Sequence, residues 1–267
     1  MRLSEVIYFL AAKKRHWRLT RLLDRVAYNF HRVHEAVGYD FDTNGEARVF
    51  EALKGQNVKC IFDVGANVGD WTLLALDAFP GSEIHCFEAA APTFESLARN
   101  VAGNPRVRLN PFGLGAAEGS AVLKYAPGDD RLTSAVEVVG TRDLVSLTAR
   151  IRAGDDYVRE NGVERVDFLK IDVEGMEGQV LAGFGRTLSE QRVRVVQFEY
   201  GQVNAFSRFL LRDFYELFDG YGYLVGKIYP HRVDFRRYDY IHEDFIGPNY
   251  LAVRRGEGGL IESLAGH

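Results

Sequence analysis

The chain has few cysteines and no long hydrophobic run. Only Cys60 and Cys86 occur among its 267 residues, which is too few for a disulfide framework or a cysteine-based zinc site. No apolar stretch approaches the ~20 residues that span a bilayer. The longest early run, Val6–Ala12, precedes its basic cluster, whereas a secretory signal has the opposite order. We therefore expect a cytoplasmic protein with reduced thiols and without a membrane-spanning helix.

The composition is otherwise that of an ordinary globular protein. Apolar residues make up 46% of the chain and charged residues 26%. This mix excludes a disordered or collagen-like chain, and no internal repeat or interdomain linker is visible. The length suits one large α/β domain with a sizeable core.

Charge is distributed unevenly along the chain. Residues 1–35 contain eight basic and three acidic side chains, so this segment carries a net charge of +5 and the remainder −9. The segment has no glycine or proline and is predicted to be helical. A basic arm can contact nucleic acid, an anionic lipid surface or an anionic glycan, but a solvated helix face is the preferred reading. The early helices can pack against a second copy or equally cover their own domain. The acidic remainder argues against nucleic acid as the main partner.

From residue 59 onwards, short apolar strands alternate with helices. Strands are predicted at 60–64, 84–88, from 107, 166–173, 193–199, 223–229 and 249–254, with shorter β pieces at 122–125 and 144–151. Helices are predicted at 46–53, 70–79, 92–101 and 205–219, and after Gly175. This alternation favours an α/β fold with a mostly parallel sheet, in which ligands bind at the carboxyl ends of the strands.

The pattern also predicts boundaries and caps. We expect a helical extension over residues 1–45, a main domain over 46–255 and a flexible, glycine-rich tail over 256–267. Thr43 and Glu46 fit a capping box at the start of the helix over 46–53. Asn204 is expected to cap the helix over 205–219.

A glycine turn follows the first strand of the main domain. Asp63-Val64-Gly65-Ala66-Asn67-Val68-Gly69 is neither the G-x-G-x-x-G of a dinucleotide site nor a P-loop. Acidic residues stand on both sides of the turn, at Asp63 and Asp70, which suits a ligand with positive charge better than a pyrophosphate. Glu88 ends the next strand about 25 residues on, where a carboxylate can accept both hydroxyls of a ribose. Together these features predict a nucleoside-type cofactor site.

Three segments now point to a known family. DVGANVGDW (63–71), Glu88 and VDFLKIDVEGMEGQVLAGF (166–184) resemble the FkbM-type S-adenosylmethionine-dependent methyltransferases, and NGE (44–46) and NPFGLG (110–115) fit as well. The resemblance covers roughly residues 40–255, and KIDVEG is its most specific part. One departure is Ala89, where the family commonly has proline.

The resemblance implies a class I methyltransferase fold, with a Rossmann-like sheet whose last strand is antiparallel. It implies S-adenosylmethionine as the cofactor and methyl transfer to a hydroxyl of a sugar, glycan or polyketide-type molecule. By position, the methionine part would contact Asp63, Gly65, Ala66, Asn67 and Gly69. Glu88 would hold the ribose, and Phe112 or a neighbour would border the adenine.

A second acidic group is predicted at the same edge of the sheet. Asp172 and Glu174 follow one strand, Glu199 ends its expected neighbour, and Lys170 can offset part of the charge. These residues are compatible with a set of salt bridges. Alternatively, Asp172 contacts the methionine ammonium while Glu174 or Glu199 is the general base for a hydroxyl. In a third reading, Asp172 and Glu199 bind a divalent ion; the metal-free base is preferred.

Three other functions stay open at this point. A nicotinamide-dependent oxidoreductase is disfavoured because the dinucleotide fingerprint is missing. A non-catalytic module that keeps the cofactor site would bind the cofactor without turnover. A nucleic-acid methyltransferase would use the basic segment over residues 1–35.

Overall fold

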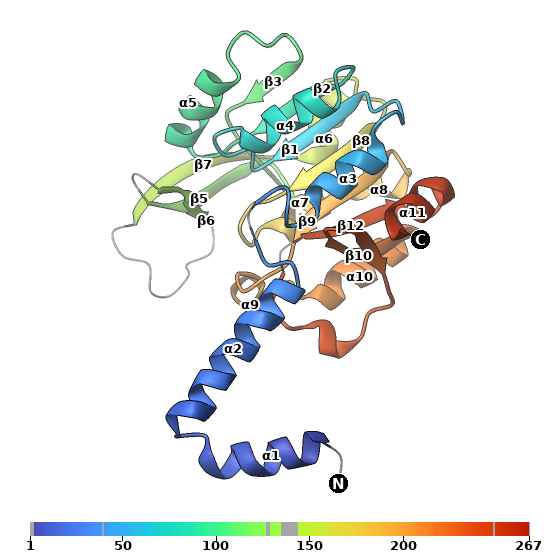
Figure 1. The fold of residues 1–267 in the computed structure, drawn as a ribbon. Coiled ribbons are helices and arrows are strands. Elements are labelled where there is room, and N and C mark those ends of the chain that lie inside the picture. Colours follow the sequence, from blue (N-terminus) through green and yellow to red (C-terminus); the bar gives the residue numbers. More distant parts are fainter. Residues whose placement is uncertain (1–2, 39, 127–128, 135–143, 248, 267) are drawn as a thin grey trace.

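The computed structural model describes residues 3–38, 40–126, 129–134, 144–247 and 249–266. Figure 1 shows one large twisted sheet with helices on both faces, a smaller sheet beside it and a helical arm that projects from the body. The large sheet has eight strands in the order β11-β10-β12-β9-β8-β1-β2-β3, and the small one has four in the order β4-β7-β5-β6. The strands are β1 (Cys60–Val64), β2 (Glu83–Phe87), β3 (Val107–Asn110), β4 (Gly113–Gly115), β5 (Gly119–Ala126), β6 (Asp129–Ser134), β7 (Val145–Ala153), β8 (Val166–Ile171), β9 (Val193–Glu199), β10 (Tyr223–Tyr229), β11 (Arg232–Phe235) and β12 (Asn249–Arg254).

Helices connect most of these strands. They are α1 (Leu3–Lys14), α2 (Arg18–His34), α3 (Glu46–Leu53), α4 (Asp70–Ala78), α5 (Ala91–Asn100), α6 (Gly154–Glu160), α7 (Glu177–Gly183), α8 (Gly185–Ser189), α9 (Asn204–Ser207), α10 (Leu211–Gly220) and α11 (Gly258–Ala265), with a 3-10 turn, η1 (Tyr240–His242). Among the described residues, no helix combines the length and apolar composition needed to cross a membrane.

The sheet topology confirms the predicted class I methyltransferase architecture. Strands β3, β2, β1, β8 and β9 pair in parallel, and β12 pairs antiparallel with both β9 and β10. The chain runs outward from β1 to β3 and then returns to β8 on the other side of β1. The strand order therefore reverses between β1 and β8, which is where open α/β sheets bind their ligands.

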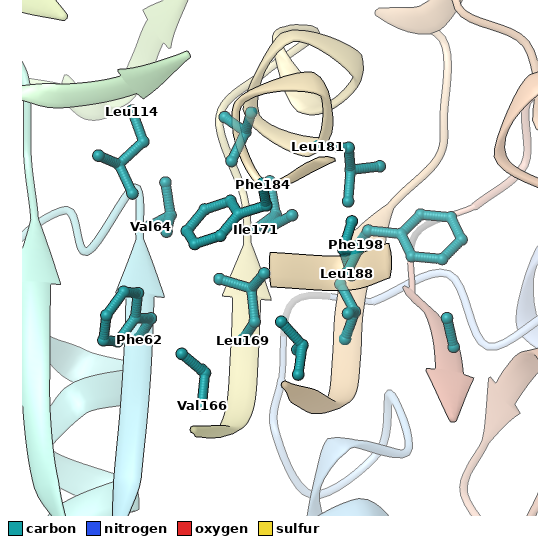
Figure 2. Close-up of a cluster of buried hydrophobic side chains, with 14 of the residues drawn as sticks. Phe62, Val64, Leu114, Val166, Leu169, Ile171, Leu181, Phe184, Leu188 and Phe198 are labelled. Atoms are coloured by element: carbon teal, nitrogen blue, oxygen red, sulfur yellow. The ribbon is translucent and has the colours of Figure 1, made fainter. Parts of the chain in front are cut away.

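Both faces of the central strands are buried, as expected for parallel strands between two helical layers. All six residues of β8 are buried. On one face, Phe62 and Leu169 belong to a cluster with Phe184, which packs from the α7–α8 region (Figure 2). On the other face, Phe168 packs against Phe50 of α3 and Trp71 of α4. Successive side chains along each strand point to opposite faces of the sheet and so pack into two hydrophobic cores, one on each face. These cores hold the strand ends in place.

The region over residues 113–153 forms more sheet than its sequence suggested. The expected β piece at 122–125 lies within β5, and the one at 144–151 overlaps β7 except for its first residue; the two strands pair antiparallel along seven residues. Together with β4 and β6 they make the second sheet, which was not foreseen. The expected strands at 223–229 and 249–254 are confirmed, while β11 between them is an addition.

Two capping expectations are wrong. Helix α3 does begin at Glu46, but Thr43 donates its hydroxyl to Asp40, and the side chain of Asn44 accepts the amide of Glu46 instead. Asn204 does not cap a helix over 205–219, because it is the first residue of α9 and its side-chain oxygen accepts the amide of Gly201. The segment forms two helices, because Arg208 adopts a left-handed φ of 61° that ends α9. Phe206 would lie on the apolar face of a continuous helix over 205–219, but in the structure it is 44% exposed.

The tail also differs from expectation over its described residues. Residues 258–265 form α11, and both Leu260 and Leu264 of this helix are buried. The helix packs against α3 and β11. The two leucines supply an apolar face that the glycines around them obscure in the sequence, so the prediction of a flexible tail is wrong there.

Candidate functional site

The glycine turn lies between the carboxyl ends of three strands. The amides of Gly65 and Ala66 both donate to the carbonyl of Phe87, at 3.0 Å, which ties the turn to β2. Gly65 has a left-handed φ of +81°, and a Cβ built on it would lie 1.8 Å from the carbonyl oxygen of Asp172. The turn therefore passes directly over the end of β8, where only glycine fits. Asn67 is also left-handed, and Gly69 leads into α4.

Glu88 fastens the turn from the side of β2. Its two carboxylate oxygens accept the amides of Asn67, at 3.0 Å, and Ala90, at 2.8 Å. Burial raises the pKa of Glu88 to about 7, although these amides oppose the shift. Each carboxylate oxygen has a second lone pair, so both keep acceptor capacity for ribose hydroxyls. The predicted contact with ribose stays a prediction.

Asp63, near the end of β1, is buried beneath the glycine turn and contacts side chains of α4 and β8. It has no exposed surface and accepts the hydroxyl of Thr72 at 2.6 Å, while the ammonium of Lys170 lies 3.7 Å from its other oxygen. Burial raises the pKa of Asp63, and the charge of Lys170 counters this rise. The expected direct contact between Asp63 and the methionine part stays a prediction. In this structure Asp63 holds the lysine and the first turn of α4.

Lys170 joins two of the predicted site carboxylates. It is buried, and its ammonium donates to Asp172 at 3.0 Å in addition to its ion pair with Asp63. Burial alone lowers the pKa of Lys170, but the neighbouring carboxylates hold it above its ordinary value. Asp172 keeps 30% of its side-chain surface exposed. It is therefore available to a cationic ligand from the solvent side.

Further carboxylates surround Asp172. Burial and the charges of Asp172 and Glu177 raise the pKa of Glu174 to about 7. Burial and the charges of Asp172 and Glu174 raise the pKa of Glu199 well above its ordinary value. Glu174 also has a positive φ of 51°, a strained conformation of the kind found at functional sites. The structure thus brings Asp172, Glu174 and Glu199 together as predicted, although their roles stay untested.

Two acidic residues of this group were missed from the sequence. Glu177 is buried, accepts the amides of Gly175 and Val173, and has a pKa raised to about 7 by burial. Its other oxygen, Oε2, has no hydrogen-bond partner. Glu46 is buried and accepts the side-chain amide of Gln197 from β9. The signal for Glu177 was its place three residues after Glu174, at the start of a helix.

Phe112, which is predicted to border the adenine, is mostly buried. It is 9% exposed and packs against Phe87 and Tyr157, with the guanidinium of Arg152 5.4 Å from the centre of its ring. Its predicted contact with adenine stays a prediction.

The acidic side chains of this site fit S-adenosylmethionine, which carries a positively charged ammonium and a positively charged sulfonium. Six carboxylates are gathered at this edge, those of Glu46, Asp63, Asp172, Glu174, Glu177 and Glu199. Lys170 is the cation paired with them. The buried Oε2 of Glu177 lacks a donor, and an excess of buried negative charge is costly without a cation. In the described part of the chain, no three His, Cys, Asp or Glu side chains are grouped to hold a metal ion.

Comparison with known proteins places this site in a family. The model of the methyltransferase FkbM domain matches residues 63–225. Methyltransferase sdnD of Sordaria araneosa is 32% identical over 153 residues, 46% of this chain and 59% of that protein. Hexuronic acid methyltransferase AglP of Haloferax volcanii is 26% identical, over 60% of this chain and 65% of that protein. The chain thus spans less than two thirds of these relatives.

Two further similarities are to proteins named FkbM. The 31-O-demethyl-FK506 methyltransferase FkbM of Streptomyces tacrolimicus is 28% identical over 197 residues, 62% of this chain and 72% of that protein. The crystal structure of methyltransferase FkbM from Methylobacillus flagellatus KT superposes with a TM-score of 0.46 at 15% identity, over 86% of this chain and 59% of that one. The family match covers more than half of the chain and includes the glycine turn and most of the acidic group, so the chain belongs to the FkbM methyltransferase family.

Proposed function

We propose that the protein is an S-adenosylmethionine-dependent O-methyltransferase whose acceptor is a hydroxyl of a sugar, glycan or polyketide-type molecule. The observation that carries this proposal is the group of carboxylates at the switch point between β1 and β8, beside a glycine turn. Named relatives include a hexuronic acid methyltransferase, a 31-O-demethyl-FK506 methyltransferase and a 2-O-methyltransferase, NoeI. The substrates in the names of these relatives are the basis for the proposed class of methyl acceptor.

The residues divide into a binding set and a proton-accepting set. Asp172 would bind the methionine ammonium, because it is partly exposed and its partner Lys170 is buried behind it. Glu88 would accept the ribose hydroxyls beside the turn. When bound, the cofactor supplies a methyl group already activated by a sulfonium, so alignment with the acceptor accounts for much of the rate.

An alcohol is a poor nucleophile until its proton leaves, so a base is needed beside the acceptor. Glu199 and Glu174 are the candidates, since both have raised pKa values and lie near Asp172. A carboxylate whose pKa lies near neutrality accepts a proton more readily than one with an ordinary pKa. Glu199 ends β9, the neighbour of β8, which places it at the same edge as Asp172.

Calorimetry with S-adenosylhomocysteine tests the proposal. The purified full chain is expected to bind this product with one site. Methyl transfer to a panel of saccharide and polyketide hydroxyls then separates an enzyme from a non-catalytic cofactor-binding module. The absence of any binding would sink the proposal. Binding without transfer to any hydroxyl would favour the module.

Glu88→Ala is expected to weaken the binding of S-adenosylhomocysteine by roughly tenfold or more. The change removes the ribose acceptor and also the two hydrogen bonds that hold Asn67 and Ala90. Glu88→Gln keeps the size of the side chain and part of its acceptor capacity, so it should lose less affinity. Equal calorimetric affinities for the wild type and Glu88→Ala would place the ribose elsewhere.

S-adenosylmethionine is expected to gain affinity relative to S-adenosylhomocysteine as the pH rises from about 6 to about 8. In this range Glu174 and Glu177, with pKa values of about 7, lose their protons and become charged. Only S-adenosylmethionine carries the sulfonium, so only its affinity should increase as the carboxylates become negatively charged. The ratio of the two dissociation constants, measured by calorimetry, should change on the order of tenfold. A ratio independent of pH would show that these carboxylates do not face the sulfonium.

A further inference from the structure

Helix α2 has an apolar stripe that nothing in the described chain covers. The apolar side chains recur at spacings of three and four and fall within an arc of about 100°. Each is between 55% and 78% exposed, and no residue of α2 is buried. The stripe consists of Leu19, Leu22, Leu23, Val26, Phe30 and Val33. Figure 1 shows α1 and α2 extending away from the body, so the stripe is not part of the core.

Beside the apolar stripe runs a stripe of arginines. Arg18, Arg21, Arg25 and Arg32 fall within an arc of about 60° on the helix, adjoining the apolar side chains. Asp24 is the single acidic residue of α2, and it lies on the far side of the arginine stripe. An apolar face flanked by arginines is typical of a helix that lies in the surface of a membrane containing anionic lipids.

The joint between α1 and α2 has the same character. Trp17 is 48% exposed, and the ammonium of Lys14 lies 4.0 Å from the centre of its ring. Ile7 and Tyr8 of α1 are also exposed. Tryptophan and tyrosine with basic neighbours favour the boundary between lipid and water, because their rings are apolar while their polar atoms can stay hydrated.

An ion pair between Glu35 and a buried lysine attaches this arm to the edge of the sheet that holds the candidate site. Glu35, directly after α2, accepts the ammonium of Lys227 at 2.7 Å and the hydroxyl of Tyr229 at 3.0 Å. Lys227 is 1% exposed. Strand β10 runs in the direction of β9, so Tyr229 ends at the same edge as Glu199. The arm therefore leaves the body at the carboxyl edge of the sheet.

We propose that α2, with Trp17, docks on the surface of a bilayer that contains anionic lipids. Because the arm is attached at the carboxyl edge of the sheet, this edge is the part of the body nearest to the docked arm. The positive charge of the arm favours an anionic lipid surface over a second copy of the chain as the binding partner. A second arm would bring another net positive segment, whereas an anionic surface complements the arginine stripe. The acidic remainder of the chain would then be kept away from that surface.

Cosedimentation of the full chain with lipid vesicles tests this proposal. Binding is expected to vesicles of phosphatidylcholine mixed with phosphatidylglycerol and not to phosphatidylcholine alone, and salt should weaken it. Leu23→Asp, in the apolar stripe, and the double change Arg21→Glu with Arg25→Glu should each weaken binding by at least about tenfold. Thr20→Asp adds one negative charge outside both stripes and is the matched control, with a change below about twofold.

Other outcomes overturn the proposal. One is equal binding to both kinds of vesicle, and another is no binding to either. A dimer in sedimentation equilibrium that dissociates in Leu23→Asp would assign the stripe to a second copy, and salt-sensitive RNA binding without vesicle binding would assign the arginines to nucleic acid. Because α2 has no buried residue, all variants should still bind S-adenosylhomocysteine in calorimetry. That readout distinguishes a failure here from a failure of the proposed cofactor site.

Discussion

Replacing Lys170 by methionine is expected to lower the free energy of unfolding by about 3–5 kcal/mol. The ammonium of Lys170 lies 3.0 Å from Asp172 and 3.7 Å from Asp63, and Asp63 has no exposed surface. Methionine fills a similar volume but carries no charge, so Asp63 would be left buried without a cation. Urea denaturation, with the slope compared between variants, measures the loss.

Two variants separate the loss of charge pairing from general effects of the substitution. Lys170→Met combined with Asp63→Asn removes the uncompensated carboxylate and should regain part of the lost stability. Lys54→Met removes the lysine of an exposed pair with Glu51 and should change stability by less than about 1 kcal/mol. If Lys170→Met costs no more than Lys54→Met, the buried charges are not coupled as the distances indicate.

The positions of the strands could be predicted because their signals are local. Residues 60–64 form a short apolar run followed by Gly65, and residues 166–171 are apolar apart from Asp167 and Lys170; both segments are strands of the central sheet. The site residues Glu88, Asp172 and Glu199 were predicted for the same reason, since each directly follows or ends a strand. Parallel topology then brings strand ends together without any knowledge of side-chain contacts.

What could not be predicted depends on contacts distant in sequence. Whether Asp63 faces a ligand or the interior depends on Lys170, which comes from a strand more than 100 residues later. Glu46 is likewise placed at the site by Gln197. The break at Arg208 follows from a single left-handed residue, whose side chain carries no glycine-like signal for such a turn.

Gly65→Ala is the second large effect, and we expect it to lower the free energy of unfolding by about 4 kcal/mol and to abolish binding of S-adenosylhomocysteine. The new Cβ would meet the carbonyl oxygen of Asp172 at 1.8 Å, far inside contact distance. Relief requires the ends of β1 and β8 to separate, which breaks the bond from the amide of Asp172 to the carbonyl of Val64, now 2.9 Å long. Both denaturation and calorimetry report the change.

Gly103→Ala is the control that isolates the contribution of backbone conformation. Gly103 has a φ of +75°, close to the +81° of Gly65, but a Cβ there would have no neighbour within 4 Å. Its cost should be only the left-handed penalty of about 1–2 kcal/mol, with cofactor binding unchanged. The difference between the two variants then measures how closely the turn must approach β8. Equal losses of stability would mean that the turn can move away from β8, and that the contact does not shape the cofactor site.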